Sequence, residues 1–93
     1  MKAIWENHIL AESDETIEVD GHHYFPPDSI NEYFFNPSIT LTSSPEKGDA
    51  RYFNITVNNS INKDAAWYYP RPRKAAHNIR GYVAFWKGVE IIE

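Results

Sequence analysis

The chain has 93 residues, which is the length of one domain, so we treat residues 1–93 as a single domain. Hydrophobic residues make up 42% and aromatic residues 15%, a composition that is typical of a folded protein and argues against a disordered one. The absence of cysteine excludes disulfides and thiolate metal sites. The longest apolar run, 82–86, is far shorter than the ~20 residues of a membrane span, so we expect a cytoplasmic protein without a membrane partner.

The charge is distributed unevenly along the chain. Residues 1–50 contain two basic and ten acidic residues, and residues 51–93 contain seven basic and three acidic residues. Either the two halves pack together and complement each other, or the basic half presents a face that attracts anions, densest at Arg71, Arg73, Lys74 and Arg80. The formal net charge of −4 does not favour nucleic acid as a partner.

Period-two alternation predicts strands along the first part of the chain. Residues 3–5 and 8–11 are expected to form a hairpin about Glu6-Asn7, and residues 16–20 a strand that turns at Gly21 into residues 22–25. Asp28 is expected to cap one helical turn that runs through 31–33, with Ile30, Tyr33 and Phe34 pointing inward.

The second part of the chain continues this pattern. Residues 38–42 are expected to form a strand with Ile39 and Leu41 inside, followed by a turn at 45–48 and the clearest strand, 51–57. Asn58-Asn59 suits a tight turn before an extended segment at 65–69. The remaining expected elements are a short helix over 74–79, closed by Gly81, and a final hairpin of 82–86 with 89–92 about Lys87-Gly88. The sum is a mainly β domain with one or two short helices and folded-over antiparallel sheets.

Several kinds of catalytic and cofactor site are not supported by the sequence. His22 and His23 are adjacent, so in a strand their side chains point to opposite faces and cannot share one metal ion. With no cysteine and no HExxH motif, we predict no metal site. The chain contains no GxSxG, GxxxxGK[ST] or GxGxxG motif, and we expect no cofactor.

Three clusters couple aromatic rings to proline or glycine, which fix the backbone. They are HYFPP at 23–27, SPEKGDARY at 44–52, and AAWYYPRP at 65–72 followed by GYVAF at 81–85. The rings either fill a small core or line a rigid small-molecule pocket. Lys47 is either an exposed turn residue or a clamp for an anion or a carbonyl group.

At these clusters the chain resembles a known family, the domain-of-unknown-function family 427, sometimes labelled a nucleotidyltransferase domain. The resemblance runs from AIWENHILAESDETIEVDGHHYFPPDSI through SPEKGDARYF and DAAWYYPRP to IRGYVAFWKGVEI. It implies a β-tent (Mss4-like) fold of two small antiparallel sheets joined along one edge. It also implies that the matching residues matter: Tyr24, Pro26, Lys47, Gly48, Tyr52, Trp67, Tyr69, Pro70, Gly81 and Phe85. Ser44 stands where the family commonly has a cysteine, which puts any thiol-dependent activity in doubt here.

Three functions remain open from the sequence. The first is a non-catalytic small-molecule-binding module with a pocket formed by Tyr24, Lys47, Tyr52, Trp67, Tyr69 and Phe85. The second is a small enzyme acting on an anionic metabolite, with Lys47 binding the anion and Tyr52 or His23 carrying the proton. This alternative includes nucleotidyl transfer, although no two aspartates have the D-x-D spacing that would suit a pair of metal ions. The third is a protein-interaction domain with the basic residues beside Trp86 as the docking face, and homodimer formation is left open.

Overall fold

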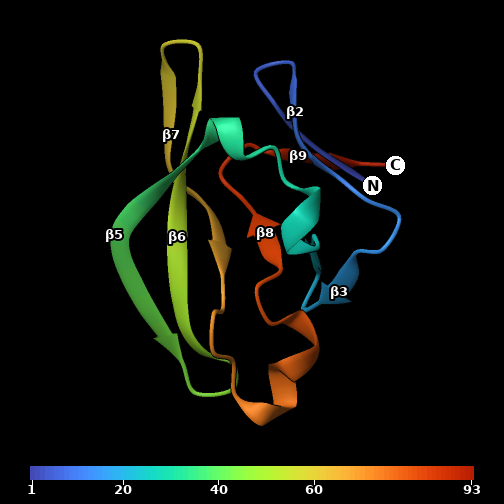
Figure 1. Ribbon diagram of the computed structural model, residues 1–93, viewed down its shortest axis with the longest axis vertical. Coiled ribbons are helices and arrows are strands. Elements are labelled where there is room, and N and C mark those ends of the chain that lie inside the picture. Colours follow the sequence, from blue (N-terminus) through green and yellow to red (C-terminus); the bar gives the residue numbers. More distant parts are fainter.

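The computed structural model describes all residues from 1 to 93 and shows a mainly β protein, as predicted (Figure 1). The strands are β1 Lys2–Trp5, β2 His8–Glu12, β3 Ile17–Val19, β4 His22–Tyr24, β5 Phe35–Ser44, β6 Gly48–Val57, β7 Ser60–Tyr68, β8 Val83–Phe85 and β9 Glu90–Ile92. Three short 3-10 segments complete the chain: η1 Pro27–Ser29, η2 Glu32–Phe34 and η3 Lys74–Ile79. No helical segment is long and apolar enough to cross a membrane.

The strands form three small antiparallel sheets, where two were expected. Their orders are β2-β1-β9, β3-β4 and β5-β6-β7-β8. The β-tent name that the family resemblance implies stays a prediction, while the mainly β class is confirmed.

The predicted turns between neighbouring strands are confirmed. Glu6 and Asn7 adopt positive φ angles of 49° and 62° between β1 and β2, and Asn58 adopts 54° between β6 and β7. Asparagine tolerates this left-handed conformation better than most residues, which makes these turns readable from the sequence. The turn before Gly48 joins β5 to β6, and Figure 1 shows it at the opposite end of the sheet from the β6–β7 turn.

A backbone pair joins the two-stranded sheet to the edge of the four-stranded sheet. The N–H of Phe25 donates to the carbonyl of Val83, and the N–H of Val83 donates to the carbonyl of Phe25, both at 2.8 Å. Through this bridge, the residue that follows β4 pairs with β8 in the antiparallel direction. Because strand residues alternate between faces, it also sends Tyr24 and Phe25 to opposite sides.

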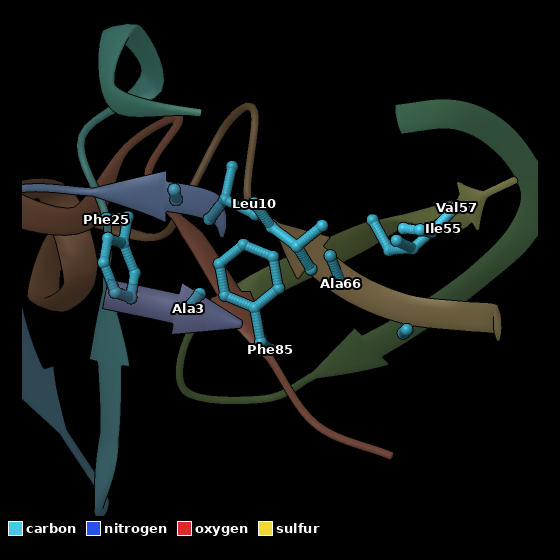
Figure 2. Close-up of a cluster of buried hydrophobic side chains, with 10 residues drawn as sticks. Ala3, Leu10, Phe25, Ile55, Val57, Ala66 and Phe85 are labelled. Atoms are coloured by element: carbon cyan, nitrogen blue, oxygen red, sulfur yellow. The ribbon is translucent and has the colours of Figure 1, made fainter. Parts of the chain in front are cut away.

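Two buried clusters result from this alternation. The first contains ten buried residues, among them Phe25 and Phe85, whose rings meet edge to face at 5.6 Å (Figure 2). The second contains Tyr24, Ala50, Trp67, Tyr69, Ala76, Ile79 and Ala84. The neighbouring pairs Tyr24-Phe25, Ala66-Trp67 and Ala84-Phe85 are each divided between the two clusters.

The predicted final hairpin is wrong. β8 pairs with β7, whereas β9 pairs with β1. Lys87 and Gly88 do form the expected turn, with φ angles of 53° and 88°. The turn therefore passes the chain from one sheet to another, which local alternation cannot reveal.

The predicted burial of Ile39 and Leu41 is also wrong, since their side chains are 102% and 54% exposed. The register of β5 against β6 shifts between Pro37 and Leu41. The hydroxyls of Ser38 and Thr40 instead point toward the protein, and both donate hydrogen bonds to the Asp64 carboxylate, at 2.5 and 2.8 Å. Desolvation raises the pKa of Asp64, but these two hydrogen bonds and the nearby charges of Lys87 and Lys63 together hold it below its ordinary value.

The helical predictions need adjustment. Residues 27–34 form two separate 3-10 turns, the first of which contains Asp28. The side chain of Asn31, rather than that of Asp28, caps a turn by accepting from the Tyr33 N–H at 3.4 Å. Tyr33 is 87% exposed instead of pointing inward. Residues 74–79 are helical as predicted, but as a 3-10 segment interrupted at Ala76.

The register of β5 against β6 can be tested by comparing a buried isoleucine with an exposed one. Ile55→Val removes a methyl group from a site with 0% exposure, and we expect it to lower the free energy of unfolding by about 0.5–1.5 kcal/mol. Ile39→Val makes the same change on the exposed strand β5, and the expected effect is within about 0.5 kcal/mol. Urea denaturation measures both, and an equal loss in the two variants would contradict the register described here.

Candidate functional site

An open cavity of about 290 Å³ lies against the second cluster. Its lining comes from the β3–β4 hairpin, the β5–β6 turn, β6, β7 and the end of β8. The lining residues are Asp20, His22, Tyr24, Lys47, Tyr52, Trp67, Tyr69 and Trp86. We call this the aromatic cavity.

The structure brings five of the six sequence-predicted site residues together in the aromatic cavity. They are Tyr24, Lys47, Tyr52, Trp67 and Tyr69. The sixth, Phe85, lies in the first cluster with 4% exposure and does not line the cavity. Its neighbour Ala84 faces the cavity side, because alternation along β8 sends the two residues to opposite faces.

Three lining residues were missed from the sequence: Asp20, His22 and Trp86. His22 stands two residues before Tyr24 on β4, so the shared face was a usable signal. Asp20 and Trp86 lie in turns that long-range strand pairing brings to the cavity, and the sequence carries no local signal for such pairing.

Trp67 is the centre of the aromatic wall. Its ring meets His22 at 5.0 Å, Trp86 at 5.7 Å and Tyr24 at 6.2 Å, with interplanar angles of 75–89°. Edge-to-face pairs of this kind are the favoured arrangement of aromatic rings. The indole N–H of Trp67 also donates to the Tyr24 hydroxyl at 3.4 Å. The ring orientations are therefore mutually fixed before any ligand arrives.

Lys47 places one positive charge at the rim of the aromatic cavity. Its backbone N–H donates to the Ser44 hydroxyl at 3.2 Å, and its carbonyl accepts from the Arg73 N–H at 2.8 Å. Its side chain is 17% exposed, and Nζ lies 2.5 Å from Oδ2 of Asp20, which is 70% exposed. Ser44 thus serves as an acceptor that fixes the turn carrying Lys47.

The ion pair shifts both pKa values. The hydrogen bond from Lys47 lowers the pKa of Asp20 below its ordinary 3.8. The hydrogen bond to Asp20 raises the pKa of Lys47 above 10.5, although desolvation opposes it. Lys47 is therefore protonated at neutral pH, and its ammonium can bind an anion or a carbonyl oxygen but cannot act as a nucleophile without losing its proton.

The other titratable groups have different surroundings. Burial raises the pKa of the Tyr69 phenol above 10.0, so this hydroxyl stays neutral at physiological pH. The Tyr52 hydroxyl lies 2.9 Å from the Thr42 hydroxyl. His23, the histidine considered as a proton carrier, is not part of the cavity wall, and its Nδ1 lies 3.4 Å from the Thr16 hydroxyl.

A second, smaller cavity of about 240 Å³ adjoins the first. It is lined by Val19, Asp20, Glu46, Lys47, Ala75, Ala76, Asn78 and Ile79. The two cavities share only Asp20 and Lys47, so the ion pair forms the partition between them. Nowhere do three or more His, Cys, Asp or Glu side chains gather in a group that could hold a metal ion.

The Lys47–Asp20 pair makes the pH response testable. Since the folded-state pKa of Asp20 is lowered, its contribution to stability is present above about pH 4 and is lost as the pH falls through the folded-state pKa. The raised pKa of Lys47 implies a contribution that is present below pH 10.5 and is lost as the pH rises through its folded-state pKa. We expect Asp20 to titrate below 3.8 by NMR, and its pKa to move up toward the ordinary value in Lys47→Gln.

Lys74→Gln is the matched control for this titration, because Lys74 is exposed and lines neither cavity. It should leave the pKa of Asp20 unchanged. An ordinary Asp20 pKa in the unmodified protein would show that the ion pair does not persist in solution.

The comparison with known families agrees with the resemblance carried by the sequence clusters. No curated protein matches the chain. A family model described as "Domain of unknown function (DUF427)" and labelled NTP_transf_9 matches residues 1–93. Because this match spans the full length, the chain belongs to the DUF427 family.

Proposed function

We propose that the chain is a small-molecule-binding module whose ligand occupies the aromatic cavity beside Lys47. The observation that carries this proposal is the fixed set of edge-to-face rings around Trp67 with one protonated lysine at the rim. Rigid walls lower the entropy that binding costs, because few side chains need to be ordered. A cytoplasmic location remains part of the proposal.

The size and chemistry of the cavity favour a small, flat ligand. Its volume of about 290 Å³ lies just below the ~300–1,000 Å³ range of ligand pockets. Flat faces suit the aromatic walls, and the Lys47 ammonium suits a carboxylate or a carbonyl oxygen on the ligand edge. Neutral nucleobases and aromatic monocarboxylates fit this description.

Asp20 has a part in ligand choice. A ligand carboxylate would share the Lys47 ammonium with Asp20 or displace it. Displacing Asp20 costs little free energy, because its side chain is 70% exposed and water can solvate its carboxylate. Asp20 therefore competes with an anionic ligand for the Lys47 ammonium. Its negative charge also repels strongly anionic ligands and so weakens their binding.

A thermal-shift panel tests the proposal. The panel contains nucleobases, aromatic monocarboxylates, sugar phosphates, and nucleoside triphosphates with and without Mg²⁺. A ligand at 100 times its Kd stabilises by about 2.7 kcal/mol, which for a domain of this size raises Tm by roughly 10 °C or more. We expect Tyr52→Leu to remove the shift for every flat ligand and Lys47→Gln to remove it chiefly for the carboxylates.

The variants are chosen to leave the fold intact. Tyr52 is half-buried, whereas Trp67 is only 8% exposed and its truncation would open the core. Lys74→Gln again serves as the control and should keep the shifts of the unmodified protein. A shift that requires triphosphate together with Mg²⁺ would favour the enzyme alternative, and flat-ligand shifts that survive both variants would exclude the aromatic cavity as the site.

A further inference from the structure

A third hollow lies away from the aromatic cavity and has the opposite chemistry. It measures about 620 Å³ and has no hydrophobic lining residue. The lining consists of Gly48, Asp49, Arg51, Pro70, Arg71, Pro72 and Arg73. We call this the arginine groove.

The arginine groove and the aromatic cavity use opposite faces of β6. Arg51 and Tyr52 are neighbours in a regularly paired part of this strand, so their side chains point to opposite faces. The two hollows share no lining residue. A ligand in one therefore does not exclude a ligand in the other by direct contact.

The positive charge of the groove is not neutralised within the chain. The only ion pair with an N···O distance within 4.0 Å is Lys47–Asp20, so Arg51, Arg71 and Arg73 have no carboxylate partner. Asp49 lines the same groove, and its Oδ1 accepts from the Ser43 hydroxyl at 2.8 Å. Three guanidinium groups against one carboxylate leave the groove with a net charge of about +2 at neutral pH.

The backbone of the groove is held in place. Pro70 and Pro72 fix φ on both sides of Arg71. The Arg73 N–H donates to the Lys47 carbonyl at 2.8 Å, which ties the loop after β7 to the β5–β6 turn. In Figure 1 these two segments meet at the lower end of the sheet.

Gly48 is required for this close approach. Its φ is +106°, a conformation that side chains with a Cβ rarely adopt. A Cβ at this position would lie 3.3 Å from the Arg71 carbonyl oxygen and 3.4 Å from the Arg73 nitrogen. The glycine therefore lets the arginine-bearing loop pack directly on the start of β6, so that Arg51 and the two loop arginines border one hollow.

We propose that the arginine groove binds a small molecule that carries two or more phosphate groups. Guanidinium groups match phosphate oxygens in a bidentate geometry and stay charged at all physiological pH values. One phosphate group can use one or two guanidinium groups, whereas three arginines that line a hollow of about 620 Å³ suit a linked pair or triplet of phosphates. The groove is a second site, distinct from the proposed aromatic one.

The test is a titration of the full chain with tripolyphosphate at low ionic strength, followed by calorimetry and by NMR of the backbone amides. We expect saturable binding of one equivalent, with amide shifts centred on residues 48–51 and 70–73. Arg51→Gln and Arg71→Gln should each weaken binding by about tenfold, because each removes a charge-assisted contact. Inorganic phosphate should bind more weakly than tripolyphosphate.

Matched control variants distinguish binding in the arginine groove from nonspecific attraction of anions to the positive surface charge. Arg80→Gln removes the same charge from an exposed residue outside the groove and should change the affinity less than twofold. Lys47→Gln and Tyr52→Leu should also keep tripolyphosphate binding, which makes this proposal independent of the aromatic cavity. A retained thermal unfolding midpoint in Arg51→Gln and Arg71→Gln confirms that the variants fold.

Four results would overturn the proposal. They are no saturable binding, equal losses in Arg80→Gln and Arg71→Gln, inorganic phosphate binding as tightly as tripolyphosphate, and amide shifts centred on the aromatic cavity. A single-stranded oligonucleotide that binds more tightly than tripolyphosphate and loses affinity in the same arginine variants would replace the small molecule with nucleic acid.

Discussion

The reciprocal hydrogen bonds between Phe25 and Val83 fix how the two walls of the aromatic cavity meet. They dock the β3–β4 hairpin on the edge of the four-stranded sheet. The hairpin then carries Asp20, His22 and Tyr24 over the face that presents Trp67. The bridge acts together with the contacts of Trp67 with His22 and Tyr24 and with the Lys47–Asp20 ion pair, which join the same two sheets.

The same bridge explains why a chain of 93 residues can form both a core and a cavity. Each of the two joined strands sends alternate residues to opposite sides, so one face of the junction receives Phe25 and Phe85 and the other receives Tyr24 and Ala84. The first side closes completely. The second side has tyrosine and tryptophan rings whose polar edges tolerate contact with water, and it stays open.

The parts of the fold that the sequence predicts well are those that depend on neighbouring residues. The hairpins at Glu6-Asn7 and Asn58-Asn59 follow from alternation on both sides of residues that accept positive φ. The predictions fail where pairing is long-range. Nothing near Lys87-Gly88 indicates that the strand after it belongs beside β1, and the exposure of Ile39 depends on a register shift and on Asp64, which lies about 25 residues away along the chain.

The candidate site divides in the same way. Aromatic residues beside proline and glycine could be recognised as one group, and five of the six predicted residues line one cavity. The sequence could not show that Phe85 lies outside the cavity, because that depends on which face of β8 packs against which cluster. The arginine groove could be foreseen only in part, because Arg71 and Arg73 stand together in the sequence while Arg51 joins them through the packing of the loop on Gly48.

The register shift in β5 has a consequence for self-association. β5 is an edge strand with two exposed apolar side chains, Ile39 and Leu41, and such edges are sites where chains aggregate by adding strands. Pro37 has no backbone N–H to donate, and the break in pairing between Pro37 and Leu41 interrupts the regular ladder. A second chain that approached this edge would therefore find no long run of evenly spaced donors and acceptors, so the irregularity that exposes the two apolar side chains also protects the protein from polymerising through them.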